Sequence, residues 1–557
     1  VQESTRKVRY KAMGCGSSVH MGEAGAGEVN WTLLSANVEA YEAQHGWVCP
    51  KGWYEGIKVA NAGQDRAVDE LLKGAAPVHA QLDPKLGARA VLIRPFAKLR
   101  SLAKFNFDPA KAAEAMLAAM NGVDTKGAHE SGLIPELPGD YKQFPCAFEG
   151  VDLADGVHRG KCVADGGNLP DTNMEAFGKM VELAGGPDKA VIGVLSISVC
   201  GLGDDVQSEW SDHQAWFNKW EKVCGSLKAC GVAGSRILNV PFTIDNKDTA
   251  KDSQECVDII RRCTGLWMPG GEHYRAIRCL FHLDETGARK SASKVYEALQ
   301  DMYRRGMMIA CTSSGAFTIT QGPLVTGGSS IHQCLVKGPS EDTKGLRPDL
   351  TYDAGGGMAL LGTEKWGSAL VEAHCPEKNR LLRLLRLLAA TKDNPKGSTF
   401  GIGIGENTQL VVDRATGWVD IQGGSCVQMV DISSATYPSA DAFSIADVAF
   451  HQLTRGDKFH LTSGEIVVAP WKTKRESSGK GLVISLDMCK EKFAVRMAAE
   501  TLIQSTESTA ICKSSEADPT FALTLEKTSE TVGFAGDFES TEYWTVQCLK
   551  ASLGPAA

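Results

Sequence analysis

The sequence has no long apolar run, no excess of positive charge and no common metal-binding spacing, and each absence excludes a class of protein. No stretch approaches the roughly 18 consecutive apolar residues of a membrane-spanning helix. The net charge of −8, from 59 basic and 67 acidic residues, argues against a general nucleic-acid or anionic-membrane binder. Because neither a C-x-x-C pair nor an H-E-x-x-H motif occurs, we expect no metal and no other cofactor.

The 17 cysteines are spread through the 557 residues. Their odd number and scattered spacing do not describe a disulfide framework, so we expect mostly buried, reduced thiols. Reduced thiols slightly favour a cytoplasmic location. The compartment stays unknown, because secretion would require only a leader upstream of Val1.

The composition and hydrophobic pattern of the sequence change twice along the chain. Residues 1–155 mix Gly-rich stretches and Pro-punctuated loops around one helical pattern, and no chemical motif gives this N-terminal region a role. Residues 156–455 alternate β-branched runs with amphipathic segments, which is typical of βαβ units around a mostly parallel sheet. Residues 456–557 predict a small, mostly antiparallel β layer appended to this core.

Short apolar runs in the central region predict strands, and longer periodic segments predict helices. The strands are expected at Ala190–Val199, Arg236–Val240, Gly265–Met268, Met307–Cys311, Gly401–Ile404 and Gln409–Val412. The helices are expected at Met174–Ala184, Asp252–Arg262 and Ala292–Arg305. In the tail, strands are expected at 466–468, 482–486, 521–525 and 543–546, around one helix at 490–503. A site is expected beyond the carboxyl ends of the parallel strands.

The sharpest local feature is a strand that runs into a turn of small residues, Cys311-Thr312-Ser313-Ser314-Gly315. This layout is typical of a nucleophile elbow, in which a tight strand-to-helix turn lifts a serine hydroxyl clear of the sheet. The general form is G-x-S-x-G, and Cys311 stands at its first position. Ser313 is therefore a candidate nucleophile, although such turns also occur without any catalytic role.

A serine hydroxyl is a weak nucleophile, so a base and an orienting acid are needed beside it. His374 lies just before a predicted helix, and Glu406 follows the short strand Gly401–Ile404. We expect these two side chains, rather than the alternatives His332 and Asp413, to complete the set.

Taken together, these segments resemble the cyanophycinase-type serine peptidases. That family carries a G-T-S-A-G-A elbow, an apolar strand ending G-G-D/N-Q, the segment D-Q-H-F-x-x-R-x-R-x-x-R-L and the segment G-I-G-I-D-E-x-T-A. The chain offers weak matches in the same order, at Ala164–Asn168, Leu183–Gly186, Trp267–His273, Cys311–Ala316, Val371–Arg383, Gly401–Thr408 and Val448–Leu461.

The resemblance implies a three-layer αβα sandwich with a mostly parallel sheet, of the class I glutamine amidotransferase-like or flavodoxin-like kind, with N-terminal and C-terminal extensions. It also implies a Ser-His-Glu hydrolase, with Ser313, His374 and Glu406 on the triad positions. Backbone N–H groups of Gly271 and Ser314 would then form the oxyanion hole.

Substrate recognition in the family uses the arginines after the histidine and an acid before it, and a glutamine stands in the Gly-Gly loop. The matching residues here are His273, Glu372, Lys378, Arg380 and Arg383. Cyanophycinases cleave a polymer whose aspartate backbone bears arginine, and they release β-Asp-Arg dipeptides. The implied partner is therefore a peptide substrate, aspartate-rich or β-aspartyl, and a homodimer is left open.

The chain departs from the family pattern at Ala373 and His273, which replace glutamines, and at Cys311, Cys375 and Gly405. Because the triad types are retained while recognition positions change, we expect a retained hydrolase mechanism and a shifted substrate. Cyanophycin should be a poor substrate, and Arg383 should anchor acidic substrates. Two alternatives stay open: an exopeptidase that cleaves after an N-terminal Asp, and an inactive binding or scaffold module.

Overall fold

The computed structural model describes residues 141–557, except 152, 155, 199–222, 245–246, 343–348, 440, 478–480, 482–485 and 557. The chain divides into two compact units, residues 1–127 and 128–557, and all of the described residues lie in the second. Most of the predicted N-terminal region, residues 1–155, therefore lies outside the described residues. Within the described part, no helix is long and apolar enough to span a membrane.

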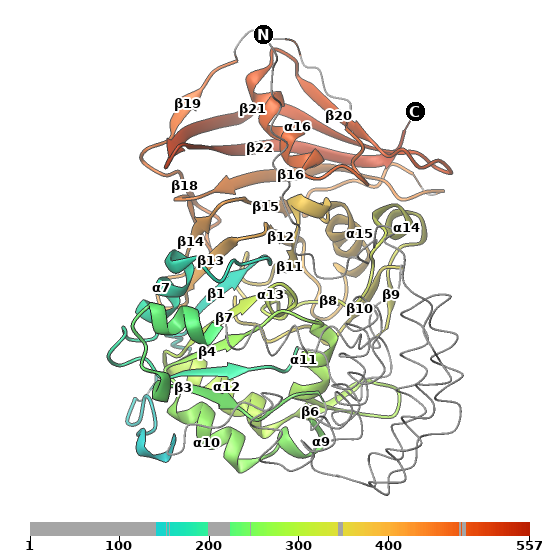
Figure 1. The fold of residues 1–557 in the computed structure, drawn as a ribbon. Helices are drawn as coiled ribbons and strands as arrows, with labels where there is room; N and C mark the ends of the chain where they lie inside the picture. The colour runs from blue at the N-terminus through green and yellow to red at the C-terminus, as the bar shows by residue number, and fades with distance from the viewer. Residues whose placement is uncertain are drawn as a thin grey trace, which may run out of the picture. The chain divides into compact units, whose positions relative to one another are not determined.

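A nine-stranded sheet forms the centre of the described unit (Figure 1). Its order is β18 (Ile466–Val467), β17 (Lys458–His460), β14 (Trp418–Gly423), β13 (Thr408–Asp413), β1 (Lys161–Asp165), β7 (Met308–Thr312), β4 (Gly265–Met268), β2 (Ile192–Leu195) and β3 (Ile237–Val240). From β1 to β3 all neighbours pair parallel, and from β1 to β18 all pair antiparallel.

Helices pack on both faces of the parallel strands because the strands are apolar on both faces. On one face, Val163 of β1 packs in a cluster with α7 (Met174–Leu183). On the other face, Cys162 and Ala164 pack in the main core cluster with α10 (Gln254–Arg262) and α12 (Lys294–Arg305). Such two-sided burial is typical of parallel sheets.

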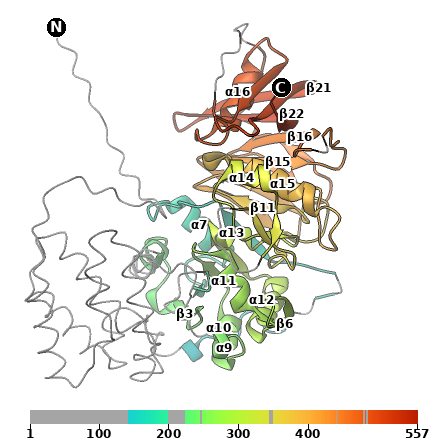
Figure 2. The same cartoon turned by 90° about the vertical axis from the view of Figure 1, so that its right-hand side faces the viewer.

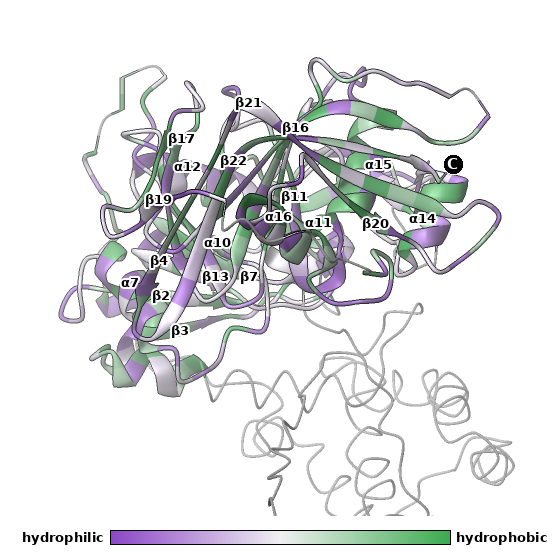
Figure 3. Ribbon diagram, turned by 90° about the horizontal axis from the view of Figure 1, so that it is seen from above, coloured by the Kyte–Doolittle hydropathy of each residue, from purple (hydrophilic) through white to green (hydrophobic). Residues whose placement is uncertain are grey.

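A second, eight-stranded sheet continues the unit toward the C-terminus. Its order is β11 (Leu370–Ala373), β12 (Phe400–Ile404), β15 (Cys426–Asp431), β16 (Ile445–Thr454), β22 (Thr541–Pro555), β21 (Phe521–Phe538) and β19 (Thr473–Arg475), with β20 (Thr509–Lys513) paired to β21. Only β11 and β12 pair parallel among these strands. Helix α16 (Ala494–Gln504) lies across β21 and β22 (Figure 3).

Shorter elements connect and cover these sheets. Helices α14 (Ile331–Lys337) and α15 (Leu381–Thr391) lie side by side, and α15 packs on β11 and β12 (Figure 2). The remaining elements are η1 (Tyr141–Gln143), η2 (Gly234–Arg236), α9 (Lys247–Ala250), α11 (His273–Leu280), β5 (Phe281–Leu283), β6 (Arg289–Ala292), α13 (Ser314–Phe317), β8 (Leu324–Val325), β9 (Ser340–Glu341), β10 (Thr351–Asp353) and η3 (Pro376–Lys378).

The predicted mixed α/β fold is confirmed, and each predicted central helix and strand is present. The strand expected at Ala190–Val199 is shorter, Ile192–Leu195, and residue 199 lies outside the described residues. The largest differences lie in the tail, where β21 and β22 run for 18 and 15 residues instead of the short strands expected. Their alternating exposed and buried residues form one long hairpin, which a search for apolar runs detects only in part. The predicted strand at 482–486 falls largely on residues outside the description.

The predicted boundaries at 155 and 455 stay predictions. Strands β17 and β18, which follow residue 455, pair into the central sheet. The strands after them extend the second sheet through the β16–β22 pairing.

Candidate active site

The elbow places Ser313 between the end of β7 and the start of α13. Ser313 has φ 53° and ψ −117°, a backbone conformation that costs free energy in a residue with a side chain. Its neighbours have no room for side chains: a Cβ at Gly270 would lie 2.9 Å from the Ser313 Cβ, and one at Gly315 would lie 3.0 Å from the Cys311 Cβ. Such crowding around a strained serine is typical of a nucleophile elbow.

The side chain of His374 bridges Ser313 and Glu406. Its Nε2 lies 2.8 Å from the Ser313 Oγ, and its Nδ1 lies 2.7 Å from the Glu406 Oε1. The histidine and the glutamate follow β11 and β12 of the second sheet, whereas the serine follows β7 of the first. The structure therefore brings the three sequence-predicted triad residues together across the junction of the two sheets.

The turn after β1 binds all three of these segments through its backbone. The successive carbonyls of Asp165–Gly167 accept hydrogen bonds from the N–H groups of Ser313, His374 and Asn407, at 2.9, 2.8 and 2.7 Å. Asn407 directly follows the glutamate of the triad. One short turn thus fixes the relative positions of segments that are far apart in the sequence.

Gly167 also sets how closely this turn approaches the imidazole. Its φ is +117°, and a Cβ added to it would lie 2.1 Å from the His374 Cε1, so only glycine fits. The next residue, Asn168, makes a side-chain hydrogen bond to Glu406. Both residues stand in a segment that the family resemblance had indicated without assigning either a role.

The electrostatics of the site favour a neutral histidine beside an ionised glutamate. Burial lowers the pKa of His374 below 6.5, although the hydrogen bond to Glu406 opposes this shift. Burial by itself would raise the pKa of Glu406, but hydrogen bonds from His374 and Asn168 lower it to about 2. At neutral pH the imidazole can therefore accept a proton from Ser313 while Glu406 holds its other nitrogen.

A buried carboxylate, Asp165, lies beneath the triad. It accepts hydrogen bonds from the Gly167 N–H at 2.8 Å, the Thr312 hydroxyl at 2.8 Å and the Gln409 amide at 2.6 Å. Burial raises its pKa to about 7. These contacts join β1, β7 and β13 directly below the elbow. The pattern in the sequence that could have pointed to Asp165 is an Asp at the end of an apolar strand, followed by two glycines.

The two predicted oxyanion-hole residues contact each other. The Gly271 N–H, expected to face the substrate, donates instead to the Ser314 Oγ at 2.6 Å. Ser314 is the first residue of α13, where backbone N–H groups have no acceptor within their own helix. The Ser314 N–H therefore fits the predicted role, and the Gly271 N–H is engaged by a side chain.

Three of the predicted recognition residues, Glu372, Arg380 and Arg383, form a largely buried charged cluster next to His374 in the sequence. The Arg383 guanidinium binds both carboxylate oxygens of Glu372, at 2.7 and 2.8 Å, and Glu372 is fully buried. Arg380 lies 3.6 Å from the same carboxylate and donates to the Ala373 carbonyl at 2.9 Å. Burial and the charge of Arg383 lower the pKa of Arg380 to about 10, so it stays a cation at neutral pH. Two arginines thus share one carboxylate.

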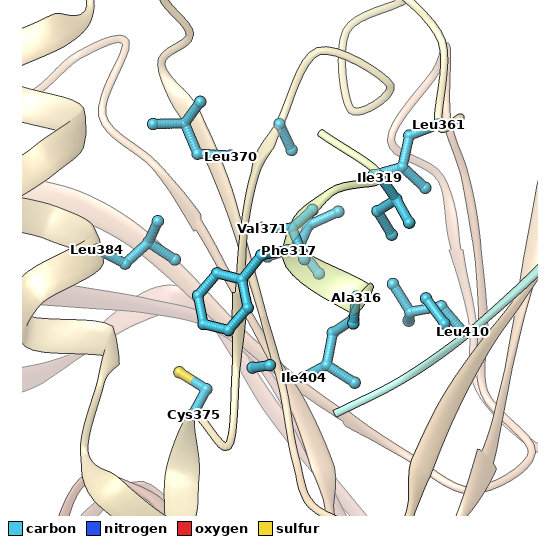
Figure 4. Packing of buried hydrophobic residues seen from close by; sticks show 14 of the residues in the cluster. Ala316, Phe317, Ile319, Leu361, Leu370, Val371, Cys375, Leu384, Ile404 and Leu410 are labelled. Carbon is cyan, nitrogen blue, oxygen red and sulfur yellow. The ribbon is translucent and has the colours of Figure 1, made fainter. Parts of the chain in front are cut away.

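Phe317 of α13 packs under this cluster. Its ring stacks on His273 with centroids 4.7 Å apart, and the guanidinium carbons of Arg380 and Arg383 lie 6.0 and 5.9 Å from it. Figure 4 shows Phe317 among the apolar side chains around α13. Burial lowers the pKa of His273 to about 3, so this predicted recognition residue is neutral. The remaining one, Lys378 in η3, is exposed.

The alternatives to the triad lie elsewhere. The His332 Nε2 lies 3.0 Å from the Pro519 carbonyl oxygen. Asp413 ends β13 and accepts a hydrogen bond from the Ala415 N–H in the turn that follows. Among the described residues, one group has atoms spaced to hold a metal ion: Asp487, Cys489 and Glu516 in the C-terminal part, outside the triad.

The folded chain thus presents an α/β scaffold with a hydrogen-bonded Ser, His and Glu. No protein-family model matches it. A segment of 239 residues, 42% of the chain, is 25% identical to the cyanophycinases of Synechococcus elongatus and Thermosynechococcus vestitus. The match covers 63% of the length of each of these curated relatives. The chain is similar to the cyanophycinase-like peptidases, and the resemblance predicted from its motifs is confirmed over this part of its length.

A solved structure of a peptidase from an acI-B1 Actinobacterium also matches part of the chain. It is 15% identical, with a TM-score of 0.35, and the match covers 55% of this chain and 98% of that one. The sequence similarity to the cyanophycinases, rather than this structural likeness, supports the resemblance to that family.

Proposed function

We propose that the chain is a serine peptidase of the cyanophycinase type, with Ser313 as nucleophile, His374 as general base and Glu406 as the acid that orients it. The observation that carries this proposal is the continuous hydrogen-bonded chain from the Ser313 Oγ through the imidazole to the Glu406 carboxylate. The strained backbone at Ser313 supports it, because such strain is common where a residue is held for chemistry.

The proposed reaction follows the order of these contacts. The Ser313 Oγ attacks the scissile carbonyl carbon and gives its proton to the His374 Nε2, while Glu406 stabilises the imidazolium through Nδ1. The imidazolium then protonates the leaving amine, and an acyl-enzyme remains. Water, deprotonated by the same histidine, releases the acid product and restores the serine.

We propose that the substrates are β-aspartyl or related Asp-containing peptides. The pairing within the cluster supports this class: Arg383 takes both oxygens of Glu372, whereas Arg380 lies 3.6 Å from that carboxylate and is also acted on by the charge of Glu272. Arg380 is therefore the guanidinium left to pair with a substrate carboxylate. This assigns the anchoring role to Arg380 and makes Arg383 the residue that neutralises Glu372.

The detailed fold class is also part of the proposal. We propose that residues around β1, β7, β4, β2 and β3 form the three-layer αβα core of the class I glutamine amidotransferase-like or flavodoxin-like kind. The two apolar clusters support it, because they place α7 on one face of the sheet and α10 and α12 on the other.

The test is covalent labelling with a fluorophosphonate probe, which needs no knowledge of the substrate. The probe should modify Ser313, and Ser313→Ala should abolish labelling and lower hydrolysis by several orders of magnitude without lowering the melting temperature. Labelling that persists in Ser313→Ala would overturn the assignment. Cyanophycin, a β-Asp-Arg dipeptide and Asp-X peptides assayed in parallel then identify the substrate. Absence of hydrolysis and of labelling would favour a binding module instead.

A further inference from the structure

Ser314 directly follows the candidate nucleophile and differs from the family pattern at that position. The family elbow has alanine directly after the nucleophile, whereas this chain has a serine. Its Oγ lies 2.6 Å from the Gly271 N, and the two residues are 43 positions apart in the sequence. Ser314 is 3% exposed, whereas Gly271 is exposed, so this contact lies at the edge of the buried region.

The direction of this hydrogen bond leaves the hydroxyl proton unused. The Gly271 N–H is the donor, so the Ser314 oxygen is the acceptor and its own hydrogen points elsewhere. Among the described residues, the structure gives that hydrogen no acceptor. A buried donor without an acceptor costs free energy, which a ligand atom that accepts the hydrogen would recover.

The contact lies next to the nucleophile. A Cβ placed on Gly270 would be 3.5 Å from the Ser313 Oγ, so the Gly270–Gly271 peptide runs alongside that hydroxyl. Ser314 follows Ser313 directly and begins α13. The Ser314 hydroxyl therefore contacts the peptide that runs alongside the nucleophile.

We propose that the Ser314 hydroxyl is a catalytic residue that donates a hydrogen bond to the oxyanion, with the Gly271 N–H bound behind it. The proposal rests on the proposed function. As the Ser313 Oγ bonds to the acyl carbon and its proton passes to the His374 Nε2, the carbonyl electron pair moves onto oxygen. That oxygen accepts hydrogen bonds from the Ser314 O–H and the Ser314 N–H. The Gly271 N–H polarises the hydroxyl and strengthens its donation.

The rate of fluorophosphonate labelling tests this role without a known substrate. In that reaction the Ser313 Oγ forms a bond to phosphorus, the P–F bond breaks, fluoride leaves and the serine proton goes to His374. The phosphoryl oxygen gains negative charge where the oxyanion would form. Ser314→Ala should slow labelling at least about tenfold. The loss should be smaller than for a typical oxyanion donor, because the freed Gly271 N–H remains nearby.

Two variants keep the experiment decisive. Thr318→Val removes another fully buried hydroxyl, one that donates to the Gly315 carbonyl at 2.6 Å, and should leave the labelling rate within about twofold. Ser314→Cys keeps a side chain of similar size with a weak donor and should give a rate between wild type and Ser314→Ala. Melting temperatures check that each variant is folded.

The outcomes separate this proposal from the one on which it rests. An unchanged rate in Ser314→Ala would overturn the donor role, and a faster rate would show that the hydroxyl blocks the oxyanion hole instead. A wild-type protein that is not labelled at Ser313, or labelling that survives Ser313→Ala, would instead overturn the proposed function.

Discussion

The two sides of the candidate site are held in different ways. On the catalytic side, the carbonyls of Asp165–Gly167 fix the segments of Ser313, His374 and Glu406. On the recognition side, Arg380 and Arg383 share one buried carboxylate, Glu372, and each also donates to a backbone carbonyl, that of Ala373 or Gly328. Backbone hydrogen bonds do not depend on side-chain identity, whereas a buried charge cluster changes with any one of its members. Apart from the crowded turn at Gly167, the catalytic side should therefore tolerate departures from the family pattern better than the recognition side.

The departures at Cys311 and Gly405 agree with this difference. Cys311 is buried in β7 beneath the elbow, and its Cβ packs close to Gly315. Gly405 has no room for the family's aspartate, because a Cβ there would lie 2.6 Å from the Ser425 Oγ. Neither change interrupts the hydrogen bonds of the triad.

The largest expected effect comes from breaking the catalytic side at Gly167. Gly167→Ala would place a Cβ 2.1 Å from the His374 Cε1, so the imidazole must move. Because a displacement of about 1 Å from the reactive geometry can cost roughly 100-fold in rate, we expect labelling of Ser313 to slow by about that factor.

Gly186→Ala is the matched control for this variant. Gly186 also has positive φ, +85°, but a Cβ there would meet nothing within 4 Å. It should lose about 1 kcal/mol of stability to backbone strain and keep the full labelling rate. Equal rates in the two alanine variants would show that the turn after β1 does not position the histidine.

On the recognition side, Arg383→Ala should lower the free energy of unfolding. The change leaves the fully buried Glu372 with the more distant Arg380 and the Ala373 N–H, and removing one partner of a buried ion pair costs about 3–5 kcal/mol. Urea unfolding measures this loss. The double variant Arg383→Ala with Glu372→Gln should recover part of it, because no unpaired charge remains. If the single variant is as stable as wild type, Arg383 is free to serve as the substrate anchor first predicted.

Arg380→Ala should instead weaken the binding of acidic substrates. Arg383 already takes both oxygens of Glu372, and Arg380 lies farther from that carboxylate, so removing Arg380 should raise KM for an Asp-containing peptide about tenfold with a smaller change in kcat. Arg380→Lys should restore part of the affinity. A peptide with its carboxylates amidated serves as the matched substrate, and its KM should be the same with wild type and Arg380→Ala. An unchanged KM for the acidic peptide would contradict the anchoring role.

The sequence predicted the catalytic side better than the recognition side for a physical reason. Ser313, His374 and Glu406 each follow a strand, and the ends of strands can be recognised from local patterns. The Gly271–Ser314 contact and the pairing of Arg383 with Glu372 depend on how distant segments pack, which local patterns do not describe. For the same reason Arg383, in a helix that reads as ordinary and amphipathic, was expected to face the substrate but is buried against a carboxylate.

The smallest expected effect is a shift in the pH profile, and it links the two sides. Protonated His374 cannot accept the Ser313 proton, so kcat/KM should rise with pH through the pKa of His374. Burial holds that pKa below 6.5, so the midpoint of the rise should lie below pH 6.5. Glu406 raises this pKa and the charge of Arg380 lowers it. Glu406→Gln should therefore move the midpoint to lower pH, and Arg380→Ala should move it to higher pH. Rates of Ser313 labelling across pH 4–8 provide the measurement. A wild-type midpoint above 6.5, or shifts of the same sign in both variants, would show that a group other than His374 controls the nucleophile.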